Sequence, residues 1–513
     1  MPTSLIGLQG LTQPMARNTM DSAAAYANGA SGSIPARQLY AARVRRMTSQ
    51  RNFWAQFMGA GAGSAVRYEP RPQGQRGMQM QITTAGTLGG VGKMGDNLFT
   101  AASQLGQLPL GKYDIYLELI SQGTGVTPHG MEVVGVNVDS LLPDELGKWG
   151  ARYLQRYIDM TALHKTAAPG RFYAGSKGSL NALRTADVFK WAEIQKGALV
   201  ASSRGALPFK AGTKNGEDVV NLAWLATDNN AYPLSRDTEY LQAVREAGAR
   251  GPTNSLFTGE IEMIDGNTIF RRRAMVEQGQ VPAGSPFTPI AYLGVADPYN
   301  AAGTNTTLQG GGNLYDASIT DTPWFIDFPG FQYKFRESET LALADSFWGS
   351  GPYYALIVNP PTAATDPGKI GMIAYTVPAG ANTLTVTSRL HASGTTAIND
   401  TTVGDVVYGG AVLNSTNYTP NYAKGAAIIP CNSYGVPIGA VLGFSREAIG
   451  FCRGNYWGEL FKQNVQGGMH GEQLFCGWTH GAAPFTNLSG DTPGLTVIGT
   501  AVSYPQYNLP NVT

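Results

Sequence analysis

The residues best suited to binding a metal ion stand close together near the C-terminal end of the chain. They occur in the segment GMHGEQLFCGWTHG and are His470, Glu472, Cys476 and His480. Zinc sites usually contain a closer pair, such as C-x-x-C or H-x-x-x-H, in at least one half of the site. Cys476 and His480 would face one ion only on a helix, and Gly477 disfavours a helix. We therefore expect an ordinary packed pair of strands here, with a metal site as the alternative.

Three further segments look like catalytic or phosphate-binding motifs, and each lacks a required feature. GAGAGS lacks the G-x-G-x-x-G spacing of a dinucleotide-binding loop, and no clear strand precedes it. GGVGKMGD has Met94 where a phosphate-binding loop needs Ser or Thr. GFSREAIG has Glu447 where a nucleophile elbow needs its second glycine. The sequence therefore predicts no catalytic residue, no cofactor and no metal, and it argues against an enzyme.

Basic residues are concentrated at the N-terminal end of the chain. The segment 1–80 holds nine arginines, no lysine and two acids, a local net charge of +7, which leaves −6 for the segment 81–513. The candidate contact residues in this region are Arg37, Arg43, Arg45, Arg46 and Arg51. Two interpretations stay open: contact with the phosphates of a nucleic acid, and pairing with acids on a neighbouring subunit.

The rest of the composition indicates a subunit that is largely covered by neighbours. Charged residues make up 14% of the 513-residue chain, whereas they make up about 25% of an ordinary soluble domain. Hydrophobic content is ordinary at 43%, so 65 glycines and uncharged polar residues replace the missing charge. Charge is depleted where subunits meet. An extracellular β-rich protein is the alternative that composition leaves open.

Cysteine usage and hydropathy bear on the compartment. The chain has three cysteines, Cys431, Cys452 and Cys476, which give no disulfide framework and fit a reducing compartment. The N-terminal segment lacks a continuous apolar core, so we expect no signal peptide. No run of 18 apolar residues occurs, so we expect no transmembrane helix.

The N-terminal half is expected to pass from an arm into a glycine-rich extended region and then into helices. Residues 36–58 could form a short amphipathic helix. Alternating residues predict strands at 78–84 and 112–121. The clearest helix runs over 143–167, with Pro143 at its first position and acids in its first turn. A second helix is expected over 185–202.

The long helix has one broad apolar face. The residues of this face recur at spacings of three and four and are Leu146, Trp149, Tyr153, Tyr157 and Met160.

The C-terminal half mixes strands and helices. The segment 219–226 predicts an apolar strand and 235–251 a helix. The segment 256–276 predicts a hairpin about Asp265-Gly266, a strong turn signal. Residues rich in Gly, Thr, Asn and Pro predict a β-rich insertion over about 300–420. A helix is expected over 438–454.

In this order the elements resemble those of a tailed-phage major capsid protein of the Hong Kong 97 fold. More narrowly, the chain is similar to the coat proteins of N4-like short-tailed phages. The resemblance is carried by RNFWAQFMGAGAGSAVRYEP with PDELGKWGARYLQRYIDM, by YLQAVREAGARGPTNSLFTGEIEMIDGNTIFRRRAMV, and by IGAVLGFSREAIGFCRG.

The resemblance implies an α+β chain with the parts of that fold. They are an N-terminal arm (1–55), an extended loop region (56–110), a peripheral domain with a spine helix (111–204), an axial domain with the β-rich insertion (205–475), and C-terminal strands that return to the peripheral domain (476–513). The arginine candidates would then face another subunit or the genome.

The function implied by the resemblance is that of a major capsid protein, not an enzyme. Such a protein would assemble with itself into hexamers and pentamers that form an icosahedral shell around double-stranded DNA. Its other partners would be a portal protein at one vertex and a cement protein, with no membrane. It would be located in the virion capsid and assemble in the host bacterial cytoplasm. The alternatives are the shell of an encapsulin-type nanocompartment and an enzyme with an unrecognised metal site.

Overall fold

A computed structural model of the chain describes its body and leaves several segments undescribed. The described residues are 52–61, 63–70, 79–85, 110–126, 138–209, 213–214, 217–218, 221–242, 263–264, 267–272, 285–292, 309–310, 328–330, 334–336, 339–340, 342, 345–358, 370–377, 385–392, 397–400, 406–407, 411–412, 427–465, 469–505 and 509. The arginine candidates Arg37, Arg43, Arg45, Arg46 and Arg51 all lie outside these residues.

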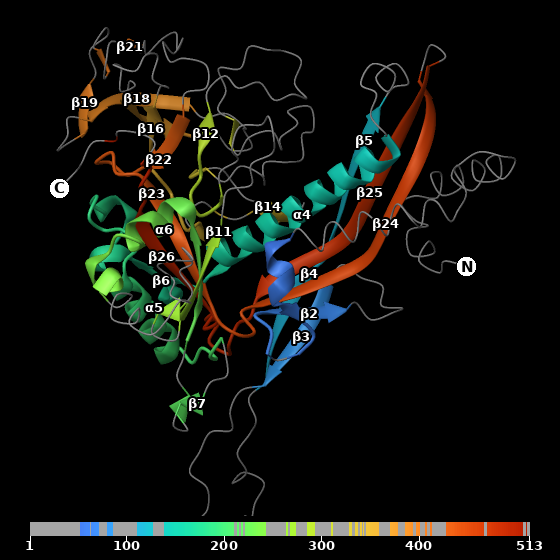
Figure 1. The fold of residues 1–513 in the computed structure, drawn as a ribbon, viewed down its shortest axis with the longest axis horizontal. Coiled ribbons are helices and arrows are strands. Elements are labelled where there is room, and N and C mark those ends of the chain that lie inside the picture. Colours follow the sequence, from blue (N-terminus) through green and yellow to red (C-terminus); the bar gives the residue numbers. More distant parts are fainter. Residues whose placement is uncertain are drawn as a thin grey trace, which may run out of the picture.

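A five-stranded sheet, which we call the hairpin sheet, contains the two longest strands. Its strands in spatial order are β1 (Met58–Gly59), β2 (Val66–Pro70), β24 (Ile449–Val465), β25 (Met469–Pro484) and β5 (Glu118–Val126). β24 and β25 pair as an antiparallel hairpin. The longest of the described helices, α4 (Val138–Lys165), lies along this hairpin (Figure 1). Its 28 residues span roughly 42 Å.

A six-stranded sheet, which we call the central sheet, forms the middle of the described body. Its strands in spatial order are β10 (Met263–Ile264), β11 (Asn267–Arg272), β9 (Ala223–Thr227), β23 (Ile438–Phe444), β26 (Leu495–Ala501) and β6 (Arg171–Tyr173). Every residue of β9, β23 and β26 is buried. Strands with such continuous apolar sequences are covered on both faces.

Alternate residues of the central sheet pack into two different cores. Ala440 and Leu442 of β23 join the core that contains α4. Val441 joins a second core with Trp224 of β9, beneath α5 (Trp191–Ser203) and α6 (Asp228–Leu234). A Cβ at Gly443 would come within 2.8 Å of the Trp224 ring, so the sheet needs glycine there.

A seven-stranded sheet packs beside the central sheet (Figure 1). Its strands in spatial order are β13 (Gln309–Gly310), β12 (Ala291–Tyr292), β22 (Ala427–Cys431), β16 (Tyr353–Val358), β17 (Ile370–Thr376), β18 (Thr385–Ala392) and β19 (Ala397–Asp400). The strands of this sheet therefore extend beyond the predicted insertion at both ends, into residues 291–292 and 427–431.

The other described strands form two-stranded pairs. They are β3 (Gln79–Ala85) with β4 (Leu110–Tyr116), β7 (Thr213–Lys214) with β8 (Glu217–Asp218), β14 (Lys334–Arg336) with β15 (Glu339–Thr340), and β20 (Val406–Val407) with β21 (Ala411–Val412). Leu117 alone separates β4 from β5, so the β3–β4 pair continues from the edge of the hairpin sheet.

The structure confirms the mixed α+β class and several expected elements. The strands expected at 78–84 and 112–121 correspond to β3, β4 and β5. β10 and β11 pair antiparallel on either side of Asp265-Gly266, as the hairpin prediction requires. Residues 238–242 are helical, 235–236 form a turn before them, and residues 243–251 of the expected helix lie outside the described residues. No helix within the described ranges is long and apolar enough to cross a membrane.

One expected helix and the expected starts of two others are wrong. The segment 438–454 forms β23 and the start of β24. Its glycines, such as Gly439 and Gly443, leave room for side chains of other segments to pack directly against the strand. The long helix begins at Val138, so Pro143 lies inside it. A proline there removes only one hydrogen bond near the helix start. The second helix begins at Trp191, later than the expected start at residue 185.

Candidate functional site

The metal-like cluster falls on a single strand. His470, Glu472, Cys476 and His480 are all residues of β25. Cys476 and His480 are separated by roughly 13 Å along an extended strand, too far to bind one ion. Among the described residues, no group of three His, Cys, Asp or Glu side chains is placed to hold a metal. The expectation of a packed pair of strands is confirmed by the pairing of β24 with β25.

The described chain begins in a short segment that packs into the core, residues 52–57, which we call the arm root. It consists of Asn52 and the 3₁₀ helix η2 (Phe53–Phe57). The Asn52 side chain accepts a hydrogen bond from the Trp54 backbone N–H at 3.1 Å and so caps the turn. Of the helix expected over 36–58, only residues 52–58 are described: Phe53–Phe57 is 3₁₀, and Met58 begins β1.

Aromatic side chains hold the arm root against the central sheet. Phe57 packs edge-on against Phe270 of β11 and Phe444 of β23, with ring centroids 4.9 Å and 5.2 Å apart. Trp54 is fully buried, and its ring centroid lies 5.1 Å from that of Phe444. Edge-to-face aromatic pairs of this kind add to the stability gained by burial.

A buried carboxylate on α4 binds the arm root. Asp159 is fully buried, and its Oδ1 accepts a hydrogen bond from the Trp54 indole Nε1 at 2.8 Å. Its Oδ2 pairs with the Arg272 guanidinium of β11. Burial raises the pKa of Asp159 above its usual value, against the opposing effect of Arg272. The side-chain amide of Gln155 also faces Arg272.

Two buried histidines lie at other contacts of α4. His480 of β25 packs edge-on against Tyr153 and Tyr157, with ring centroids 5.1 Å and 4.6 Å apart. His164, near the end of α4, accepts a hydrogen bond at Nδ1 from the Phe347 backbone N–H at 3.3 Å. Burial lowers the pKa of each histidine to about 3. Both are therefore neutral near pH 7.

A second arginine–aspartate pair ties α5 to the segment before β26. Arg204 donates to both carboxylate oxygens of Asp491, at 2.9 Å and 2.6 Å. It also donates to the carbonyl oxygens of Thr492 and Leu495, at 2.7 Å and 2.8 Å. Burial opposes ionisation of Asp491, but the hydrogen bonds and charge of Arg204 hold its pKa below the usual value.

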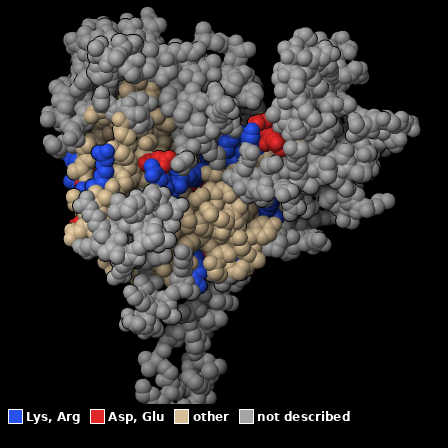
Figure 2. Space-filling model, viewed as in Figure 1, with Lys and Arg blue, Asp and Glu red and all other residues tan. Residues whose placement is uncertain are grey.

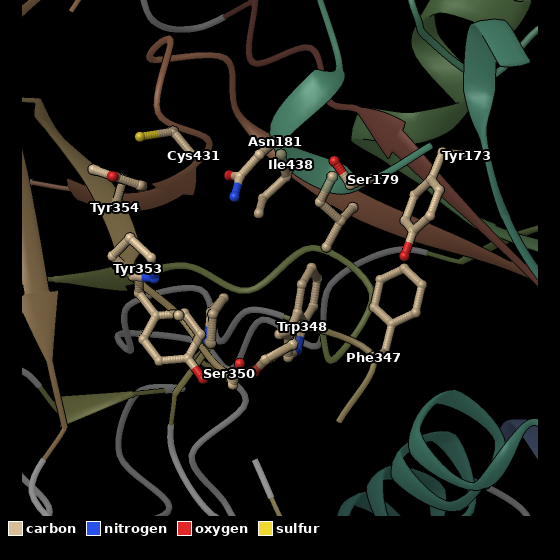
Figure 3. Close-up of a pocket in the computed structure, with 15 residues that line it drawn as sticks. Tyr173, Ser179, Asn181, Phe347, Trp348, Ser350, Tyr353, Tyr354, Cys431 and Ile438 are labelled. Atoms are coloured by element: carbon tan, nitrogen blue, oxygen red, sulfur yellow. Dashed lines mark hydrogen bonds between the residues drawn. The ribbon is translucent and has the colours of Figure 1, made fainter. Parts of the chain in front are cut away.

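A hollow of about 170 Å³, open to solvent, lies where the central sheet meets the seven-stranded sheet. Its aromatic lining residues are Tyr173, Phe347, Trp348, Tyr353 and Tyr354, and the side chain of Asn181 points in between them (Figure 3). None of the described residues that line it is charged. The hollow could not be predicted from the sequence, because its walls come from segments far apart in the chain.

The residues that bind the arm root were not predicted from the sequence either. Asp159 lies beside the predicted apolar face of the long helix, and nothing in its spacing links it to Trp54 or Arg272. The partners are 105 and 113 residues away. The one signal in the sequence is that the acid stands between two apolar residues, Ile158 and Met160. The structure shows that both are buried.

Three solved structures similar to this chain are phage capsids. The capsid of Ralstonia phage GP4 matches with a TM-score of 0.47 and 10% identity, over 88% of this chain and 90% of that chain. The Cyanophage Pam1 capsid asymmetric unit matches with a TM-score of 0.49 and 12% identity, over 88% and 93%. The acidic stable capsid structure of Helicobacter pylori bacteriophage KHP30 matches with a TM-score of 0.49 and 10% identity, over 88% and 91%.

No protein-family model and no curated protein sequence matches the chain.

Proposed function

We propose that this chain is the major capsid protein of a tailed phage. It would assemble with itself into hexamers and pentamers that form an icosahedral shell around double-stranded DNA. The role is structural and requires no catalysis. The observation that carries the proposal is the set of extended elements on one side of the body: the long β24–β25 hairpin with α4 along it, the β3–β4 pair, and the arm root (Figure 1).

Within the described residues, the β3–β4 pair is joined by no further strand. A two-stranded pair such as β3–β4 is only marginally stable alone, and the connection between its strands, from Ala85 to Leu110, is unusually long. Within the described residues, β5 pairs with β25 along one edge and with no strand along the other. A free strand edge is a template for pairing with another chain. Contacts with neighbouring subunits would complete these elements.

The scarcity of charge on the described surface supports the same role. Figure 2 shows that most described residues on one face are uncharged, with lysines, arginines and acids in small groups. This pattern agrees with the charged fraction of 14%. A surface that is covered in a shell needs little charge to stay soluble.

The basic N-terminal region has a specific part in the proposal. Some of Arg43, Arg45, Arg46 and Arg51 would pair with acids across a subunit boundary. The remainder, with Arg37, would contact the DNA without regard to its sequence. The arm root fixes where this region joins the body.

The proposal includes the other partners and the location of the chain. A portal protein would occupy one vertex, and a cement protein is a further partner. Assembly would take place in the host bacterial cytoplasm, and the final location would be the virion capsid. The relationship to N4-like phages stays a prediction.

The direct test is electron microscopy of the purified full-length protein, together with the nucleic acid content of any particles. We expect closed shells or capsomers, and DNA in particles isolated from infected cells. A protein that stays monomeric under all assembly conditions would contradict the proposal. Shells that enclose enzymes and no DNA would favour a nanocompartment instead.

A further inference from the structure

Asp159 lies where three segments that are far apart in the sequence meet. It belongs to α4, Trp54 belongs to the arm root, and Arg272 ends β11. One carboxylate oxygen accepts the indole N–H at 2.8 Å, and the other pairs with the guanidinium. The arm root and the central sheet are therefore bound to the same residue of the long helix.

The two bonds depend on each other because Asp159 has no contact with solvent. Its side chain is fully buried, and the Arg272 side chain is only 10% exposed. A buried carboxylate is stable only when its donors are all in place. The Arg272 guanidinium also lies 5.9 Å above the Phe53 ring, so both members of the ion pair touch the arm root. Loss of either donor weakens the hold of Asp159 on the other.

We propose that Asp159 is a positioning residue for the N-terminal arm. Through Trp54 and Arg272 it couples the arm root to the central sheet, and so fixes the direction in which the arm leaves the body before a neighbouring subunit is engaged. This inference rests on the proposed function, in which the arm contacts a neighbour. It concerns a residue that the sequence resemblance does not single out.

Trypsin cleavage in unassembled full-length protein tests the coupling, because the region before the arm root is rich in arginine. Trp54→Phe keeps an aromatic ring and removes the N–H donor. A hydrogen bond to a buried charged group contributes more to stability than one between neutral groups, so we expect cleavage after Arg51 and its neighbours to be at least about tenfold faster. Arg272→Lys should also accelerate this cleavage, although residue 272 lies outside the arm.

Trp224→Phe is the matched control. Trp224 is fully buried, and its Nε1 has no hydrogen-bond partner within the described residues. The same substitution there removes no bond to the arm root, so its arm cleavage should stay within about twofold of wild type. Equal cleavage rates in the Trp54→Phe and Trp224→Phe proteins would overturn the proposal.

Assembly provides the second readout. At equal concentrations of folded protein, Trp54→Phe and Asp159→Asn should form particles several-fold more slowly than wild type, and Trp224→Phe should not. Faster arm cleavage with an unchanged rate of particle formation would overturn the positioning role. If wild type itself forms no particles, the proposed function fails, while the cleavage comparison still decides whether Asp159 couples the arm root to the central sheet.

Discussion

Two arginine–aspartate pairs join distant parts of this molecule, and the pKa of the aspartate is shifted in opposite directions in the two pairs. Arg204 and Asp491 are 287 residues apart, and Arg272 and Asp159 are 113 apart. The pKa of Asp491 is lowered and that of Asp159 is raised. Asp491 is partly exposed and both of its oxygens accept from Arg204, whereas Asp159 is fully buried. An ion pair stabilises its carboxylate only when hydrogen bonds outweigh the loss of water.

The two pairs therefore respond to pH in opposite directions. The lowered pKa of Asp491 gives stability that is present above the unfolded pKa and is lost as the pH falls through the folded pKa. The raised pKa of Asp159 has the reverse effect: its contribution is greatest below the unfolded pKa and declines as the pH rises through the folded pKa.

The largest effect is expected when the buried pair is broken. Asp159→Ala leaves Arg272 buried without its anion and should lower the free energy of unfolding by about 3–5 kcal/mol. Urea denaturation followed by circular dichroism would measure this. Replacing both residues by apolar side chains of similar volume should cost less than the single change. A double variant as unstable as Asp159→Ala would show that packing around Asp159, and not an unpaired charge, sets the cost.

His480 is a buried ionisable group of a different kind: it pairs across the hairpin sheet with Arg453 of β24, whose positive charge adds to the effect of burial. The pKa of His480 is lowered from 6.5 to about 3, so its contribution to stability is present above pH 6.5 and is lost as the pH falls from there toward 3. Between pH 7 and pH 5 this amounts to about 2 kcal/mol. His480→Phe should remove that part of the acid sensitivity. An unchanged pH dependence of unfolding would show that His480 does not titrate in this range. His164→Phe is the parallel variant, because the pKa of His164 is lowered to the same value.

A smaller effect is expected at the pair with the lowered pKa. Asp491→Asn keeps one acceptor oxygen for Arg204 and removes the negative charge, which should cost about 1–2 kcal/mol at pH 7. The difference from wild type should shrink as the pH falls, because wild-type Asp491 then becomes protonated. Thermal unfolding at pH 7 and at about pH 2.5, which lies below the usual aspartate pKa of 3.8, would measure both values. A cost that grows at low pH would contradict the lowered pKa of Asp491.

The smallest effect is expected at an exposed pair next to the buried one. Arg271 and Asp228 are 2.6 Å apart, but their side chains are 49% and 38% exposed. Asp228→Asn should change stability by less than about 0.5 kcal/mol, and salt should weaken the difference further. A loss as large as that of Asp159→Ala would mean that burial does not explain why the ion pairs of Arg271 and Arg272 contribute differently to stability.

Local patterns in the sequence were sufficient to predict the elements whose stability is local. The apolar face of the long helix is buried as expected at Leu146, Tyr153, Tyr157 and Met160. The Asp265-Gly266 turn signal predicted the pairing of β10 with β11. In both cases the residues that decide the structure lie within a few positions of one another.

The sequence was insufficient where distant contacts decide the structure. The segment 438–454 contains Gly439, Gly443 and Gly450 among apolar residues, which either a helix or closely packed strands could use. The contact of Gly443 with Trp224, which belongs to a strand much earlier in the chain, favours the strand. Asp159, which lies off the apolar face of the long helix, is buried by other segments. Periodicity within one helix does not reveal such partners.

The path of the chain through the long hairpin has a mechanical consequence. The hairpin is inserted between β23 and β26, which are neighbours in the central sheet, so the chain leaves and returns at almost the same place. At that place the Ser445 N–H donates to the carbonyl oxygen of Gly494 at 2.9 Å, and a Cβ at Gly494 would come within 2.8 Å of Ala448. The 17 residues of β24 extend roughly 55 Å from this point. A force applied at the far end of the hairpin would therefore be transmitted to the central sheet at this junction, as a torque about Gly494.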